Sequence, residues 1–157
     1  MDNNLIDLAQ KIAHEMVERE WKLGTVECGV DGVISHHIFE TEDGPAVLGF
    51  SLVTDDLQEA IELMNLPRPQ FRNAGDFSRK AARAAAREGI AFLGVNLCLV
   101  AWGEEFTLDE TKRRPVHLAV ATNREVLDEM LYIEGEREVA ADQIVAAVLR
   151  LAQDLLI

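Results

Sequence analysis

The chain has 157 residues, of which 48% are hydrophobic and 27% are charged, and its formal net charge at pH 7 is -13. These values are typical of one folded domain over residues 1–157, and they exclude collagen-like, coiled-coil and disordered chains. The longest nearly apolar run, residues 90–103, is shorter than the roughly 20 residues that a membrane helix needs. The acidic N-terminus lacks the features of a secretory signal. We therefore expect a cytoplasmic protein with no membrane contact.

Residues 5–21 carry apolar side chains at helical spacing, which predicts a first helix that stops before Gly24. Two segments rich in apolar residues then flank an acidic turn at residues 41–44, and this pattern predicts a β-hairpin over residues 26–53. In its second strand one face is apolar and is expected in the core. That face consists of Ala46, Leu48, Phe50 and Leu52.

A second helix is expected from a cap at Thr54 or Asp55 to Asn65, where two prolines follow. Residues 66–75 are predicted as a loop, and residues 76–89 as a third helix.

The run at residues 90–103 predicts a central strand, and residues 114–122 its antiparallel partner. Residues 123–134 fit either a short helix or an edge strand, and we favour the helix. A final helix begins near Val139. Because the strands arrive in pairs, we predict an α+β fold with an antiparallel sheet of about four strands and helices packed mainly on one face.

The third helix carries a cationic stripe, whereas the chain as a whole is acidic. Residues 66–89 hold six bases and two acids. Four of the bases fall within an arc of about 100° on the helix. They are Arg79, Lys80, Arg83 and Arg87.

The like-charged pairs Arg79–Arg83 and Arg83–Arg87 each cost about 0.2–0.5 kcal/mol in an isolated helix, so we expect nearby anions. One interpretation is pairing with carboxylates of the same fold. The other is a surface for a protein partner, a second copy or a phosphate-bearing small ligand, assisted by Arg68 and Arg72. Nucleic acid is disfavoured because the molecule as a whole would repel a polyanion.

Other candidate residues have weaker signals. His36 and His37 are weak metal candidates, because neighbouring residues of a strand point to opposite faces. Asn96 interrupts the central strand and, with Trp102 and His117, defines a candidate pocket. No phosphate-binding, dinucleotide-binding or nucleophile motif occurs, so no catalytic residue, metal or cofactor is predicted.

From charge and missing motifs we expect a non-enzymatic, acidic protein-binding module, such as an adaptor, a chaperone or an immunity-type inhibitor, that self-associates. The alternative is a small-ligand-binding protein or enzyme that uses the pocket near Asn96, Trp102 and His117.

Overall fold

A computed structural model describes residues 3–66, 79–103 and 113–156. Within these residues the helices are α1 (Asn3–Arg19), α2 (Val33–Phe39), α3 (Gly44–Val47), α4 (Leu57–Met64), α5 (Arg79–Leu93) and α6 (Arg137–Leu156). The strands are β1 (Leu23–Cys28), β2 (Leu48–Thr54), β3 (Leu97–Gly103), β4 (Arg114–Ala121) and β5 (Val126–Ile133). None of the described helices is long and apolar enough to cross a membrane.

The strands form a five-stranded mixed sheet in the order β2-β1-β3-β4-β5. Strand β1 pairs in parallel with both β2 and β3, while the β3–β4 and β4–β5 pairs are antiparallel. The predicted antiparallel four-stranded sheet is therefore wrong. Helices connect β1 to β2 and β2 to β3, and such crossovers are what parallel neighbours require.

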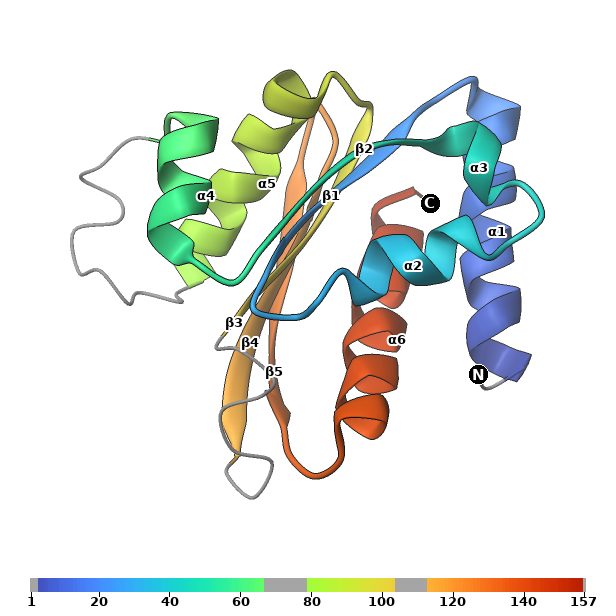
Figure 1. The fold of residues 1–157 in the computed structure, drawn as a ribbon. Coiled ribbons are helices and arrows are strands. Elements are labelled where there is room, and N and C mark those ends of the chain that lie inside the picture. Colours follow the sequence, from blue (N-terminus) through green and yellow to red (C-terminus); the bar gives the residue numbers. More distant parts are fainter. Residues whose placement is uncertain (1–2, 67–78, 104–112, 157) are drawn as a thin grey trace.

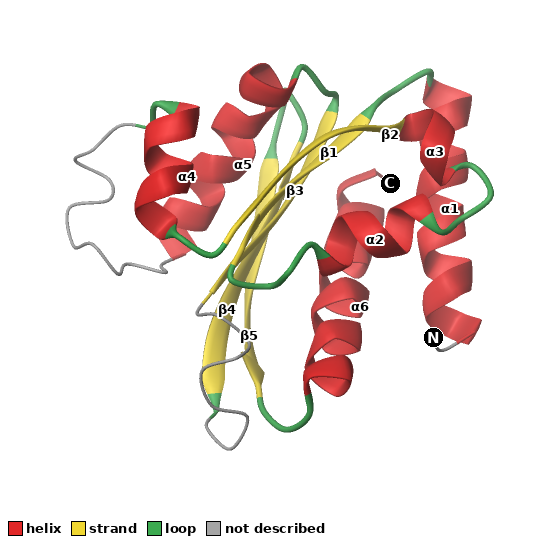
Figure 2. Ribbon diagram, in the orientation of Figure 1, coloured by secondary structure: helices red, strands yellow, loops and turns green. Residues whose placement is uncertain are grey.

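Helices cover both faces of this sheet, so the expectation of one covered face is also wrong. Figure 1 shows α4 and α5 on one side and α1, α2, α3 and α6 on the other, with the strands, yellow in Figure 2, as the middle layer. Each face has its own hydrophobic core. The buried alanines and Gly89 of α5 let this helix lie close to the sheet. A Cβ added at Gly89 would stand 2.5 Å from Sγ of Cys98.

The predicted hairpin over residues 26–53 is replaced by a crossover from β1 through α2 and α3 to β2. The first predicted strand is helix α2, in which Ile34 and Ile38 are buried one turn apart. Apolar residues four apart share one face of a strand as well as one face of a helix, so the apolar content of this segment does not distinguish the two. The strand itself lies earlier, at Leu23–Cys28, where every residue is buried.

Strand β2 lies at the edge of the sheet, and Phe50 on it is 69% exposed, contrary to its predicted place in the core. The cause is an irregularity in the register, since Leu23 pairs with Leu48 but Thr25 pairs with Ser51. One extra residue in β2 shifts the alternation between the two faces.

Several other elements follow the sequence with shifted ends. Helix α4 is capped by Asp56, whose carboxylate accepts hydrogen bonds from the backbone of Gln58 and Glu59, and it ends at Asn65 as expected. Residues 90–93 form the last turn of α5, so the predicted central strand starts only at Leu97. Residues 126–133 form strand β5, so the helix that we favoured there is wrong. The antiparallel partner strand and the final helix are confirmed.

Candidate functional site

The turn after β1 has an unusual backbone and is held by a buried carboxylate. Gly29, Asp31 and Gly32 all have positive φ, between 58° and 77°. Glu27 is fully buried, and its Oε1 accepts a hydrogen bond from the backbone of Ile34 at 2.7 Å. Its Oε2 accepts hydrogen bonds from the Ser35 backbone at 3.1 Å and the Thr25 hydroxyl at 2.9 Å. The first turn of α2 is thus bound to a carboxylate of the same chain.

The environment of Glu27 acts on its pKa in two directions. Burial raises the pKa, while the hydrogen bonds from Ile34, Ser35 and Thr25 act to lower it, and the net result is a raised value. The oxygens of Glu27 already accept hydrogen bonds from groups inside the fold, which favours a positioning role for this carboxylate.

The turn lies beside the carboxyl ends of the neighbouring strands. The Gly29 backbone donates a hydrogen bond to the Thr54 carbonyl at 2.9 Å, which ties the turn to the end of β2. Asp31 forms an ion pair with Arg137 at the start of α6. On the other side of β1, Trp102 is the next-to-last residue of β3 and is buried, and Arg114, 3% exposed, begins β4. Buried and charged groups of several elements are therefore distributed along this edge of the sheet.

The candidate pocket of Asn96, Trp102 and His117 is brought together only in part. Trp102 and His117 are cross-strand partners on β3 and β4. Asn96 precedes the opposite end of β3, six residues away and therefore about 20 Å along an extended strand. There its Oδ1 accepts a hydrogen bond from the Lys22 backbone at 2.8 Å. Asn96 anchors the connection between α1 and β1.

His117 carries a buried ring nitrogen. Within the described part of the chain, Nδ1 has no hydrogen-bond partner. Burial lowers the pKa of His117, although the negative charge of Asp128 acts to raise it. Because the pKa is below its usual range, the imidazole is neutral at pH 7.

The two thiols are not nucleophiles in the folded state. Burial raises the pKa of Cys98 to about 12. Burial also raises the pKa of Cys28 to about 12, helped by the charges of Asp55, Asp56 and Glu59. Both side chains are therefore protonated at pH 7, and the thiolate is the reactive form.

Two members of the cationic stripe on α5 bind one carboxylate of β5. Nε of Arg79 lies 2.7 Å from Oδ1 of Asp128, and Arg83 pairs with Oδ2 of the same group. Although burial acts to raise the pKa of Asp128, these hydrogen bonds and charges lower it overall. Lys80 and Arg87 have no ion pair with any residue in the described ranges. Arg68 and Arg72 lie outside those ranges.

The two weak metal candidates lie on α2. His36 is exposed, whereas His37 is buried with Nδ1 2.7 Å from the Val33 carbonyl and Nε2 3.6 Å from Asp142. Across residues 3–66, 79–103 and 113–156, no three or more His, Cys, Asp or Glu side chains are grouped to hold a metal.

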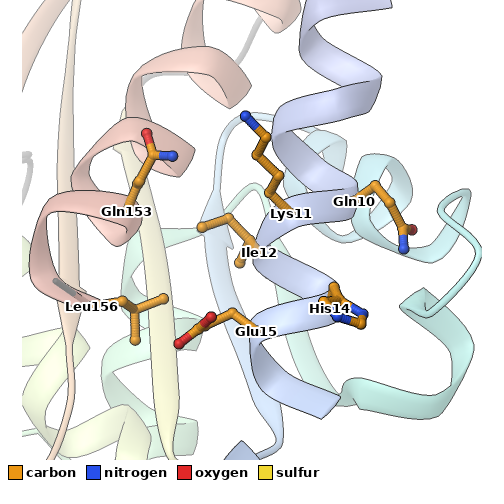
Figure 3. Close-up of a pocket in the computed structure, with 7 residues that line it drawn as sticks. All are labelled: Gln10, Lys11, Ile12, His14, Glu15, Gln153 and Leu156. Carbon is orange, nitrogen blue, oxygen red and sulfur yellow. The ribbon is translucent and has the colours of Figure 1, made fainter. Parts of the chain in front are cut away.

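A surface groove of about 520 Å³ lies between α1 and α6. In Figure 3, Ile12 and Glu15 of α1 face Leu156 of α6 across it. The remaining lining residues are Gln10, Lys11, His14 and Gln153. Its polar groups do not converge on one point in this view, and it lies away from the turn after β1.

Comparison with known protein families identifies the fold. The family model of the CinA C-terminal domain matches residues 5–156. The chain belongs to this family. A comparison of the CinA-family chain with curated proteins gives no match.

Solved structures agree with this assignment. A competence/damage inducible protein from Agrobacterium tumefaciens is 20% identical with a TM-score of 0.86, and the alignment covers 99% of this chain and 97% of that one. A competence or damage-inducible protein from Enterobacter asburiae is 16% identical with a TM-score of 0.85, covering 99% and 100%. A CinA superfamily protein from Escherichia coli is 15% identical with a TM-score of 0.81, covering 99% and 93%. These likenesses establish the CinA fold.

Sequence reasoning missed three residues of interest on the CinA fold. Glu27 could have been found as a lone acid within a short apolar segment that precedes Gly29. The sequence around Arg124 contains no pattern that indicates a site, because Arg124 joins a groove with residues of α5 only when the turn after β4 packs near that helix. Arg114 also lacks such a pattern, since its burial depends on the strands around it.

Proposed function

We propose that this CinA-family domain binds a small polar ligand at the carboxyl edge of strands β2, β1 and β3. The proposal favours the ligand-binding alternative. It places the ligand at the edge where Trp102 and the turn after β1 lie, and not near Asn96.

The topology around β1 carries this proposal. Strand β1 lies between two parallel neighbours, and the chain visits β2 on one side and β3 on the other. The first connection, through α2 and α3, packs in one core, while the second, through α4 and α5, packs in the other. In open parallel sheets this reversal leaves a crevice outside the carboxyl ends of the strands, and ligands bind there.

The side chains near this edge suit a polar ligand. Asp55, Asp56 and Glu59 lie close enough to Cys28 for their charges to raise its pKa. On the β4 side the edge carries Arg114, whose guanidinium is a hydrogen-bond donor. Acceptors on one side and donors on the other favour a molecule that has both kinds of group. Because neither thiol is activated, the proposal is limited to binding.

A pair of glycine substitutions tests the location. Gly32 and Gly94 both have positive φ, 72° and 67°, and neither has an atom nearer than 3.5 Å to an added Cβ. Alanine at either position costs about 1–3 kcal/mol of backbone strain. Gly32 lies at the carboxyl edge and Gly94 before β3, at the opposite edge.

We would screen the wild-type chain by thermal shift against mononucleotides, amino acids and sugar acids. We expect at least one compound to raise the melting temperature of the wild type and of Gly94→Ala but not of Gly32→Ala. Absence of any stabilising compound, or equal loss in both variants, would contradict the proposal.

Protein binding through strand β2 is the second candidate, and it keeps the expected self-association. The edge strand exposes Phe50 and Val53, at 69% and 45%, and Phe39 of α2 is 55% exposed. Residues 44–54 contain no charged side chain, although the chain has a net charge of -13. An uncharged edge strand is a template for pairing, and two copies of an acidic protein meet most easily where acids are absent. The partner that we propose is a second copy.

Sedimentation velocity tests this candidate. We expect a dimer for the wild type, a monomer for Phe50→Lys and a dimer for Val139→Lys, because Val139 is 51% exposed on α6, away from the edge strand. A monomeric wild type, or a dimer that survives Phe50→Lys, would exclude self-association through β2.

A further inference from the structure

A groove of about 510 Å³ lies between α5 and the turn that joins β4 to β5. The pairing of Cys98 with Ala121 places this turn at the edge where β3 begins. The groove is therefore at the opposite edge of the sheet from the turn after β1. A ligand bound here would be independent of the proposed carboxyl-edge site.

Three arginines line this groove, and they are Arg83, Arg87 and Arg124. Arg83 is already paired with Asp128. Neither Arg87 nor Arg124 has an ion pair with any other residue that the structure describes. Glu125 is the one carboxylate among the lining residues. An acidic protein thus gathers cations at one place without enough local acids to neutralise them.

We propose that this groove binds the phosphate group of a small phosphomonoester. Arginine forks match phosphate oxygens in pairs, so Arg87 and Arg124 are the expected contacts. Oγ1 of Thr122 accepts a hydrogen bond from the Arg124 backbone at 3.3 Å, and its own hydrogen can still be donated. The Thr122 backbone donates to the Glu125 carbonyl at 3.0 Å, which closes the turn that carries these groups.

The rest of the groove favours an ester over free phosphate. Ile90 and Val126 contribute an apolar part of the lining. An apolar ester group placed against them gains the free energy of burial, which inorganic phosphate cannot. A long polyanion is disfavoured, because most of its charges would lie over an acidic surface.

Titration calorimetry with phenyl phosphate and with inorganic phosphate tests the proposal. We expect phenyl phosphate to bind more tightly than inorganic phosphate. Arg87→Gln and Arg124→Gln should each weaken phenyl phosphate binding about tenfold or more, because each removes a charge-assisted hydrogen bond. Arg150→Gln on α6 makes the same change of net charge on an arginine outside the groove, and it should leave the affinity unchanged. Glu125→Gln should increase the affinity, since it removes the only acid from the lining.

Each alternative result overturns the proposal. Absence of phenyl phosphate binding to the wild type removes it directly. If Arg150→Gln weakens phenyl phosphate binding as much as Arg87→Gln does, the affinity responds only to net charge. If benzyl alcohol binds as tightly as phenyl phosphate, the groove is an apolar cleft with no phosphate site. Tighter binding of a single-stranded oligonucleotide than of phenyl phosphate assigns the groove to nucleic acid. A change of native mass in Arg87→Gln assigns it to contact between copies. None of these results bears on the carboxyl-edge site, which has its own glycine test.

Discussion

Two carboxylates in this molecule bind their donors in different ways. Glu27 is fully buried and accepts hydrogen bonds from two backbone N–H groups and a hydroxyl within a few residues of itself. Asp128 is partly buried on β5 and is held by Arg79 and Arg83, more than forty residues earlier in the chain. The first arrangement fixes a turn, and the second joins a helix to a strand.

The difference shows where binding capacity remains. Around Glu27 the donors at the start of α2 are used inside the fold, so that helix end has little left to offer an anion. Around Asp128 the cations outnumber the acids, and Arg87 and Arg124 remain available to a ligand. The turn after β1 therefore positions a site, while the outer face of α5 can itself form one.

Removal of the Glu27 side chain should have the largest effect. Glu27→Ala leaves two buried N–H groups without acceptors and opens a cavity, so we expect the free energy of unfolding to fall by about 3 kcal/mol. Urea denaturation at pH 7 measures it. Thr25→Val keeps the carboxylate and removes only one donor, so its loss should be smaller. Equal stability of Glu27→Ala and the wild type would show that the turn does not depend on this carboxylate.

Asp128→Asn should have a smaller effect, about 2 kcal/mol at pH 7, because it weakens charge-assisted hydrogen bonds that are only partly buried. Glu129→Gln is the matched control, since Glu129 is exposed on the same strand. A loss in Glu129→Gln as large as that in Asp128→Asn would contradict a specific role for the pair with α5.

The two carboxylates should also respond to acid with opposite sign. The pKa of Asp128 is lowered, so its stabilisation is complete above its ordinary value of 3.8 and is lost as the pH falls through the folded pKa. The pKa of Glu27 is raised, so its contribution grows as the pH falls through the folded pKa towards 4.5. Urea unfolding from pH 7 to pH 3 should therefore show the gap between wild type and Asp128→Asn closing only below about pH 4. A gap that closes near neutral pH would contradict this assignment.

The fold was predictable where periodicity is strong and local. The amphipathic patterns of α1, α4 and α6 predicted helices whose described bounds differ by a few residues. The sheet topology was not predictable in the same way, because parallel pairing joins strands that are distant in sequence and leaves no local pattern. The short strand at Leu23–Cys28 was lost because all its residues are buried, so it does not alternate.

The candidate sites also differ in how far the sequence predicts them, because some depend on local spacing and others on contacts between distant elements. The stripe of Arg79, Lys80, Arg83 and Arg87 could be found by sequence alone, since helical spacing determines which side chains share a face. Its carboxylate partner on β5 could not, because that strand was interpreted as a helix. Arg124 joins the same groove only through the packing of the turn after β4 against α5. Spacing predicts a face of one element but not what the fold places opposite it.

The smallest expected change in the free energy of unfolding distinguishes two kinds of arginine. Arg83 is paired with Asp128, whereas Arg87 and Arg124 have no ion pair within the described residues. Arg87→Gln and Arg124→Gln should change the free energy of unfolding by less than about 0.5 kcal/mol, because exposed charges without a partner contribute little to stability. Arg83→Gln should cost more, since it removes a partner from Asp128. Urea denaturation of the three variants at pH 7 gives the order. If Arg87→Gln proves as destabilising as Arg83→Gln, then Arg87 stabilises the fold, and the contrast between a closed carboxylate turn and an open cationic face fails. If it proves neutral, Arg87 does not stabilise the fold, and its guanidinium stays available to a ligand.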